Sequence, residues 1–506
     1  MVQILANRRI VLDPAPRRAT PPPMEAVLFG HCPGRVRPGR LSQYARERLA
    51  QLGFAKEAEA LPLAATQPGL DDTAEVSNPI NDNSPLSSEQ LFAARVQQLH
   101  HLPLAFASLA DFTDCFPDAD SAACAYTSQL AGASAWLPSA VEDFFRAGGR
   151  LLWVIVVGEN EGQRGFLPRA GAVALSQPTS LRGFELLGLL TSAALVAVPD
   201  LERLQIPATL PPPPRMQLPN PEPLFLPCAD NSGDHNDPPQ ERRSASDMLT
   251  APQPLPFTLI ARHLLTFLAR WRTDMQLLLT APLHFSDGLE RPALDHAAVS
   301  AIGDADDTLL RHLQPLFPYL RDTRHSLSSA TGLIAGAICA SAAQISPWAS
   351  IAGKRLTCIA RPYPEQRPLE IAQLREELNL GVIIPAAGGV VLDDERTPCQ
   401  TFQLSAEIVR FVGWLRRQLN ELGNDLVFSV DPHDPRPELA LRHFFTRLHQ
   451  AGALRGRTSE EAFSLEVTQP GEGQVIFTIL IAPAFPIDRI TLTLVADRGQ
   501  WSVANG

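Results

Sequence analysis

Histidine is a common metal ligand, but the histidines of this chain are not spaced as zinc sites require. His443 and His449 are six residues apart, so they point to different faces of a helix rather than forming an i, i+4 pair. His100, His101 and His433 have no cysteine nearby at ligand spacing. We therefore predict no metal site and interpret these histidines as ordinary surface or core residues.

The cysteines indicate neither a metal cluster nor a disulfide framework. They are odd in number, scattered, and contain no CxxC pair. This pattern predicts reduced, mostly buried thiols. The seven are Cys32, Cys115, Cys124, Cys228, Cys339, Cys358 and Cys399.

Carboxylates occur at two places in the sequence where they could act in catalysis or bind a cation. Asp200 follows Pro199 at the end of an apolar run, and α/β enzymes place catalytic acids at such strand ends. No His, Lys or Arg accompanies it at a recognisable spacing, so we interpret it as a helix cap or turn residue. Asp393, Asp394 and Glu395 are consecutive and could bind a cation, but such runs in hairpins are usually solvated.

The glycine motifs of known catalytic loops are missing from the sequence. It contains no GxxxxGK[ST], no GxGxxG after an apolar run and no GxSxG. Gly332 to Gly336 and Gly388-Gly389 are interpreted as glycine-containing turns. We therefore predict no catalytic, cofactor-binding or metal-binding residue and no cofactor. An α/β enzyme with an unrecognised site stays as an alternative.

The length, charge and hydropathy of the chain argue against further classes of protein. A chain of 506 residues is long enough for two or three compact units. It has 43 Lys and Arg against 54 Asp and Glu, and a net charge of -11 argues against nucleic acid as a partner. No window approaches the roughly 18 apolar residues of a membrane span, and residues 1–18 have no apolar signal core. We expect a soluble protein made in the cytoplasm, without stable membrane insertion.

The elements before residue 345 alternate between helices and apolar strands. Apolar runs at 25–30, 151–157, 193–198 and 275–280 have the length of strands buried on both faces, and the helical pattern over 257–271 leads into the last of them. Alternation of this kind predicts a mainly parallel α/β sheet with right-handed crossovers.

The last third predicts an α+β unit. It contains a hairpin over 381–392, a helix over 437–450, a strand over 426–430 and later strands, which are expected over 463–467, 475–481 and 490–495. A helix over 405–422 has apolar residues at helical spacing, while Arg410, Arg416 and Arg417 lie elsewhere on its circumference. That arginine face is either solvated or meets an acidic surface.

Proline tracts divide the chain, which has 47 prolines. The predicted organisation is an N-terminal arm over 1–22, an α/β domain over 23–200 with a surface insertion over 38–100, a Pro-rich insertion or linker over 201–256, a continuation of the α/β domain over 257–345, and a C-terminal domain with a terminal strand arm over 346–506.

Two passages, taken in order, resemble contractile tail sheath proteins of phages and phage-tail-like injection systems. The first is the strand, helix, Gly-Gly, strand sequence from Pro103 to Val156, with Leu195 to Asp200 after it. The second combines Ser346-Pro-Trp348, Leu380 to Ile383, Arg396-Thr397, Ala451 to Gly456 and Ala462-Phe463. The resemblance covers residues 100–200 and 330–500. The tryptophan-glycine that the family has before Arg-Thr is replaced by Asp393-Asp394-Glu395.

The resemblance implies a multidomain sheath-like fold, with a central α/β domain and a C-terminal α+β domain that ends in β-strand arms. It implies a structural subunit, not an enzyme, that forms a helical homo-oligomer around an inner tube protein and contacts baseplate and tail-terminator proteins. The subunit would be made in the cytoplasm and become part of a phage tail or injection particle. A baseplate or tail-terminal paralogue is the alternative.

The resemblance also implies which residues meet other subunits. Residues 1–20 and 485–500 would be arms that add strands to a neighbour's sheet around 463–481. The interface candidates are Ile10, Val11, Ile490, Leu492 and Leu494, and the tube-facing candidates are Arg410, Arg416 and Arg417.

Overall fold

The fold comes from a computed structural model. It describes residues 24–61, 99–169, 171, 174–210, 254–285, 292–323, 326–426, 435–471, 474–484, 490–497 and 500–505. Within these residues no helix is long and apolar enough to cross a membrane.

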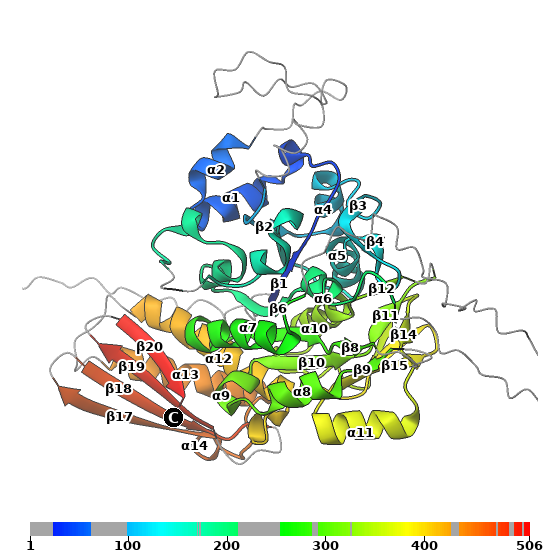
Figure 1. Ribbon diagram of the computed structural model, residues 1–506. Coiled ribbons are helices and arrows are strands. Elements are labelled where there is room, and N and C mark those ends of the chain that lie inside the picture. Colours follow the sequence, from blue (N-terminus) through cyan, green and yellow to red (C-terminus); the bar gives the residue numbers. More distant parts are fainter. Residues whose placement is uncertain are drawn as a thin grey trace, which may run out of the picture.

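A large sheet forms the centre of the molecule (Figure 1). Its order is β13-β16-β15-β10-β7-β6-β1-β5-β2, and the six strands from β15 to β5 are parallel, which confirms the mainly parallel prediction. The parallel strands are β1 (Glu25–Gly30), β5 (Leu152–Val156), β6 (Ala193–Ala197), β7 (Gln276–Thr280), β10 (Leu313–Phe317) and β15 (Gly381–Ala386). The antiparallel ones are β2 (Pro103–Phe106), β13 (Arg355–Thr357) and β16 (Gly389–Leu392).

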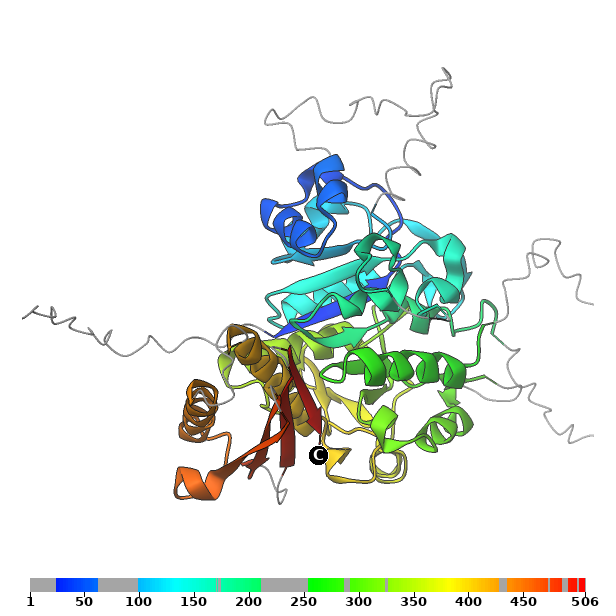
Figure 2. The ribbon, with the colours of Figure 1, turned by 90° about the vertical axis from the view of Figure 1, so that its left-hand side faces the viewer.

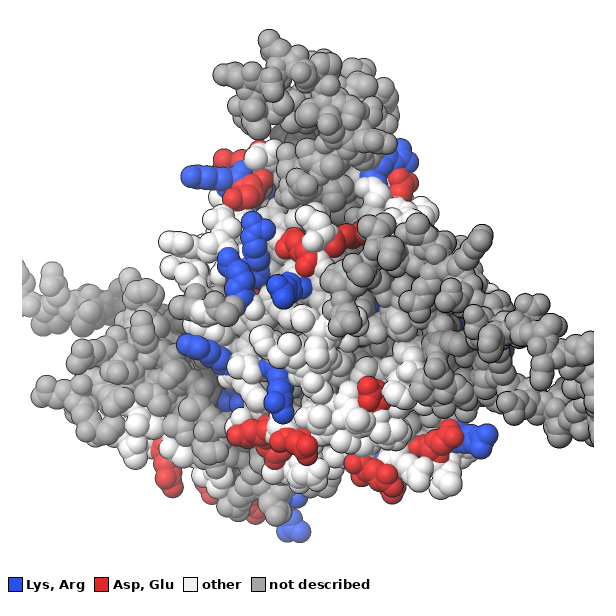
Figure 3. Space-filling view, in the orientation of Figure 1, with Lys and Arg blue, Asp and Glu red and all other residues white. Residues whose placement is uncertain are grey.

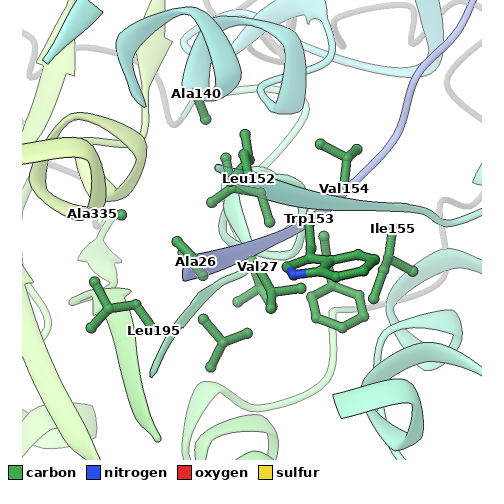
Figure 4. Packing of buried hydrophobic residues seen from close by; sticks show 14 of the residues in the cluster. Ala26, Val27, Ala140, Leu152, Trp153, Val154, Ile155, Leu195 and Ala335 are labelled. Carbon is green, nitrogen blue, oxygen red and sulfur yellow. The ribbon is translucent and has the colours of Figure 1, made fainter. Parts of the chain in front are cut away.

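The apolar runs form central strands because both of their faces are covered. Val27 of β1 pairs with Trp153 of β5 and with Val196 of β6, and all three side chains are buried. Figure 4 shows this layer, with Ala140 of a helix above the strands. Strands β13, β15 and β16, which the sequence predicts to be part of the last unit, extend the same sheet.

Helices cover the sheet on its two faces. Leu279 and Leu313 face a cavity together with Phe257 of α7 (Phe257–Trp271), whereas Gln276 and Gln314 contact α12 (Ala406–Leu426). Alternate residues of a strand point to opposite faces, so α7 and α12 lie on opposite sides. Helices α5 (Leu137–Arg146) and α10 (Thr331–Gln344) pack on β1 and on each other.

The glycines at 332 and 336 allow α10 to lie directly on α5. A Cβ on Gly332 would collide with the backbone of Ala140, and one on Gly336 with the backbone of Phe144. The interpretation of this segment as a turn is therefore wrong. Small residues four apart put two helix backbones in contact, and the helical apolar residues around them are buried.

The expected surface insertion over 38–100 begins as packed structure. Helix α1 (Gln43–Gln51) lies on β2, and the buried Arg46 donates hydrogen bonds to the carbonyls of Pro38, Leu41, Ala58 and Leu61. This arginine holds η1 (Pro38–Arg40) and α2 (Ala55–Ala60) around α1. Residues 62–98 lie outside the described part.

The remaining elements are short connections and caps. Before residue 295 they are α4 (Leu109–Cys115), β3 (Ala123–Ser128), β4 (Gly132–Ser134), η2 (Glu159–Gly165), η3 (Pro178–Ser180), η4 (Gly183–Gly188), α6 (Pro199–Arg203), β8 (Leu283–His284) and β9 (Ala293–Leu294). After it they are α8 (His296–Gly303), α9 (Asp307–Leu310), β11 (Tyr319–Arg321), β12 (Leu327–Ser328), β14 (Arg361–Tyr363), α11 (Pro368–Leu378) and η6 (Phe402–Leu404).

A second unit follows the large sheet along the chain (Figure 2). It contains α12, α13 (Arg436–Gln450), α14 (Ser459–Ala462) and a four-stranded sheet, and its core includes Phe411, Leu415, Phe445 and Ile479. Helix α12 runs on to Leu426, so the strand expected over 426–430 is wrong at its first residue. Residues 427–434 are outside the described part.

Candidate functional site

The C-terminal sheet is a four-stranded antiparallel meander. Its strands are β17 (Phe463–Gly471), β18 (Gln474–Ile481), β19 (Ile490–Asp497) and β20 (Gln500–Asn505), in that order across the sheet. Strand β20 was not expected from the sequence. It lies against α12, so that edge of the sheet is covered by the chain's own helix.

Alternation along β18 sets which face is buried. Val475, Phe477, Ile479 and Ile481 are buried against α12 and α13. The residues between them are only partly buried on the opposite face. Side chains of a strand alternate between the two faces of the sheet. The buried face of this sheet therefore packs on the helices, and its other face is left partly exposed.

Strand β17 is an open edge of this sheet. It is nine residues long, and no described strand pairs with its outer side. The edges of the large sheet are much shorter, with three residues in β13 and four in β2. Proteins usually protect a long edge with lysine, proline or a bulge. Strand β17 has Pro470, and its register with β18 shifts between Thr468 and Gly471, so the part of the edge without such protection is residues 463–468, where Glu466 is the only charged side chain.

The phase of hydrogen bonding identifies the groups that face outward. The Ala482 N–H donates to the Ala462 carbonyl oxygen, at 2.9 Å, just before β17 begins. Hydrogen-bonded pairs alternate in an antiparallel ladder, so Ser464 and Glu466 direct their backbone groups toward β18. Leu465 and Val467 then direct theirs to the open edge, and Val467 is 40% exposed.

The predicted arm residues divide into two groups. Ile10 and Val11 lie outside the described residues. Ile490, Leu492 and Leu494 belong to β19, where they pair with Ile481, Ile479 and Phe477 of the same chain. We expected this strand to be free to pair with another subunit's sheet, but β19 lies between β18 and β20 of its own chain and presents no edge. The open edge belongs to β17 instead.

The predicted tube-facing arginines lie inside the molecule. Arg410 and Arg416 are 2% and 4% exposed. Arg410 forms an ion pair with the buried Glu395, and Arg416 and Arg417 donate to the backbone carbonyls of the 273–274 turn. The expectation that these side chains face outward is therefore corrected.

Helix α12 has two buried faces, which explains this result. Its apolar stripe packs on the C-terminal sheet, and its arginine face packs on the large sheet. Gly413 permits the second contact, since a Cβ there would collide with the Asp274 carbonyl. Whether a polar helix face is exposed to solvent depends on which other segments of the chain pack against it. The sequence of the helix alone does not show this.

The three consecutive carboxylates are used for ion pairs. Asp393 pairs with Arg375 at 2.8 Å and Asp394 with Arg396 at 2.6 Å, while Glu395 turns inward to Arg410. Successive side chains of an extended segment point in opposite directions, which separates the three carboxylates from one another. The described residues contain no group of three His, Cys, Asp or Glu side chains that could hold a metal ion.

Asp200 is a structural cap at the carboxyl ends of β1 and β6. Its two oxygens accept hydrogen bonds from the backbone N–H groups of His31, Trp136 and Leu137, each at 2.9 Å, and from Arg203 Nε at 2.9 Å. Two of these donors, Trp136 and Leu137, lie at the start of α5, whereas Asp200 itself lies inside α6 and does not cap that helix. The sequence interpretation overlooked Arg203, three residues away, as its ion-pair partner.

Glu202 is a buried carboxyl group in this region whose pKa departs from its ordinary value. It is 1% exposed, and its Oε1 accepts a hydrogen bond from the Thr280 N–H. Burial raises its pKa to about 7. Both Glu202 and Asp200 are buried, so a substrate does not reach them in this conformation, and their geometry supports packing of α6 rather than catalysis.

The described cysteines are free thiols, and all six are buried, as predicted. Burial raises the pKa of Cys115 and Cys124 to about 12, and that of Cys358 and Cys399 to about 11. Thiols with such pKa values are poor nucleophiles at neutral pH.

Side chains of both signs lie on the described surface. On the face in Figure 3, acidic side chains gather over α8, α9 and α11, and basic side chains lie above them. No single-sign field covers the described part of that face.

The comparisons with known proteins give distant structural likenesses. No family model matches the sequence, and no curated protein matches it. The chain is similar to a chain of the anti-feeding prophage helical sheath in the contracted state, with 16% identity, a TM-score of 0.48, and coverage of 80% of this chain and 88% of that one. It is similar to a chain of the anti-feeding prophage baseplate, with 15% identity, a TM-score of 0.47, and coverage of 77% and 86%. A sheath tail protein from Listeria innocua has 11% identity, a TM-score of 0.37, and coverage of 48% and 54%.

Proposed function

We propose that this chain is a structural subunit of the contractile sheath of a phage-tail-like injection system. The observation that carries the proposal is the open edge of β17, regular over residues 463–468, together with the sheath-like residue passages of the sequence. In this proposal the subunit forms a helical homo-oligomer around an inner tube, and contraction drives the tube.

Strand addition is the step that links subunits. An extended arm of a neighbour pairs with the outward N–H and C=O groups of β17. Five or so such bonds at about 1 kcal/mol each make a weak single contact, and many contacts around a ring make a strong assembly. A head-to-tail contact that does not close on itself builds a helical tube. Rotation of rigid subunits about the strand links then provides contraction.

The remaining assignments depend on this proposal. The partners are further copies of the chain, an inner tube protein, and the baseplate and tail-terminator proteins. The role is structural rather than enzymatic, and the chain passes from the cytoplasm into the assembled particle. The arm that reaches β17 is taken to be the segment over residues 1–20 of a neighbour.

A baseplate or tail-terminal paralogue is the second candidate, and one observation favours it. The C-terminal sheet already contains the chain's own β19 and β20, and in this proposal β17 is the edge, among its described strands, that stays open for a partner, whereas β20 lies against α12. A subunit with one open edge accepts one strand. Such a subunit can end a tube or join it to another component without continuing the lattice.

Negative-stain electron microscopy of the purified chain tests the proposal. The chain is imaged alone and mixed with the tube protein encoded beside it. Long striated cylinders support the main sheath role. Single rings, or particles only at tube ends, indicate the paralogue. Monomers under both conditions contradict both assignments.

A further inference from the structure

A polar cavity separates α12 from the amino ends of β1, β6 and β7. Its volume is about 640 Å³. Trp414, Arg416 and Arg417 of α12 form one wall, and Trp271 and Asp274 of the turn before β7 form part of another. The cavity lies at the opposite ends of the strands from Asp200 and is separate from the β17 edge.

Two of the three carboxylates that line this cavity have arginine partners, and the third, Glu421, is exposed. Asp274 accepts from Arg272 at 2.9 Å and from Arg417 at 3.1 Å. Glu25 accepts from Trp153 Nε1 at 2.6 Å and from Arg48 at 3.2 Å. Arg272 and Arg417 thus share the single charge of Asp274, and Arg48 pairs with Glu25. These interactions leave neither carboxylate bonded to Arg416.

Arg416 is a buried cation without an acidic partner. It is 4% exposed, and its hydrogen bond is from Nη1 to the Thr273 carbonyl, at 2.9 Å. Its Nε has no partner, and neither has Nε1 of Trp414 on the same wall. Burial lowers the pKa of Arg416 to about 10; the charge of the nearby Arg311 adds to this effect, and the charge of Asp274 opposes it. A buried charge is usually paired, so this arrangement lacks an anion.

We propose that this cavity binds an acidic peptide segment, with a carboxylate of that segment as the counter-ion of Arg416. The indole rings of Trp271 and Trp414 supply apolar wall beside the charge. The chain's own start is a poor occupant although Met24 lines the cavity, because residues 1–23 contain Arg8, Arg9, Arg17 and Arg18 against the single carboxylate Asp13. We assign the segment to another polypeptide.

Isothermal titration of the full chain with capped peptides tests this inference. The probe is N-acetylated, C-amidated tetraglutamate, and the matched probe is the tetraglutamine peptide. Inorganic phosphate is a third titrant, which distinguishes a free oxyanion from a peptide. Arg416→Gln removes the cation, and Arg442→Gln is the control because Arg442 is exposed on α13. Circular dichroism checks that each variant is folded.

The expected result is binding of tetraglutamate to the wild type and to Arg442→Gln with equal Kd, and at least 10-fold weaker binding to Arg416→Gln. Tetraglutamine does not bind. Equal affinity in Arg416→Gln, or no binding of tetraglutamate to the wild type, overturns the proposal. Binding of phosphate without binding of tetraglutamate also overturns it, because the site then takes a free anion. The β17 edge is not involved, so these outcomes leave the sheath proposal unaffected.

Discussion

At the scale of single residues, buried charges connect the two sheets. Arg410 of α12 reaches Glu395 at the end of the large sheet, with side chains 1% and 0% exposed. The same guanidinium lies within 3.3 Å of Gln314 on β10. Removing one member of such a pair leaves an uncompensated charge in a dry interface, which is more costly than the pair itself is stabilising.

Arg410→Met is therefore expected to lower the free energy of unfolding by about 3–5 kcal/mol. The matched control is Arg442→Met, whose partner Glu438 is 39% exposed, and a loss below about 1 kcal/mol is expected there. Urea unfolding followed by tryptophan fluorescence measures both. Adding Glu395→Gln to Arg410→Met is expected to recover part of the loss. A double variant as unstable as the single one contradicts the ion-pair explanation.

Glu202 is expected to make the stability of the folded chain depend on pH. Its pKa in the folded chain is about 7, above the ordinary value of 4.5, because burial disfavours the charged form. Protonated Glu202 therefore contributes to the free energy of unfolding. This contribution is fully present below pH 4.5 and is lost as the pH rises through 7. Glu202→Gln stays neutral and is expected to remove up to about 3 kcal/mol of this pH dependence. Urea midpoints of both proteins from pH 4.5 to 8 test it, and parallel curves would show that Glu202 does not titrate in this range.

At the scale of elements, close helix contact depends on glycine. The α5–α10 contact has no space for a side chain at Gly332 or Gly336. Both helices lie on β1, so a shift between them also disturbs the central strand.

Gly336→Val is expected to lower stability by at least 1–3 kcal/mol through overpacking. The control is Gly303→Ala at the end of α8, where an added Cβ meets nothing within 4 Å. That change is expected to be neutral or to stabilise by a few tenths of a kcal/mol, through higher helix propensity. Thermal unfolding compares the two. A tolerated Gly336→Val would mean that α10 moves away from α5 without cost.

Local patterns in the sequence predicted elements well, and predicted their surroundings less well. The apolar runs of β1, β5, β6 and β7 identify buried strands because a strand covered on both faces needs no polar residue. The arginine face of α12 cannot be distinguished from a solvated face locally, since its partners Glu395 and Asp274 lie outside the helix, and Asp274 is 143 residues from Arg417. The open edge of β17 depends on where β19 and β20 pair, which residue periodicity does not specify.

At the scale of the whole molecule, the two units differ in how they meet other chains. The large sheet ends in the short strands β13 and β2, which offer few free backbone groups. The C-terminal sheet offers the nine residues of β17. Assembly through strand addition should therefore depend on β17 and be insensitive to the edges of the large sheet.

Proline substitutions at two adjacent positions of β17 distinguish an effect on assembly from an effect on folding. Val467→Pro removes an outward N–H, so the ladder to β18 is kept and the edge cannot be paired fully. Glu466→Pro removes an inward N–H and is expected to destabilise the C-terminal sheet. We expect Val467→Pro to retain the wild-type unfolding midpoint within about 1 kcal/mol while forming no cylinders in negative-stain images. Cylinders of normal length from a folded Val467→Pro protein would show that strand addition at β17 is not the link between subunits.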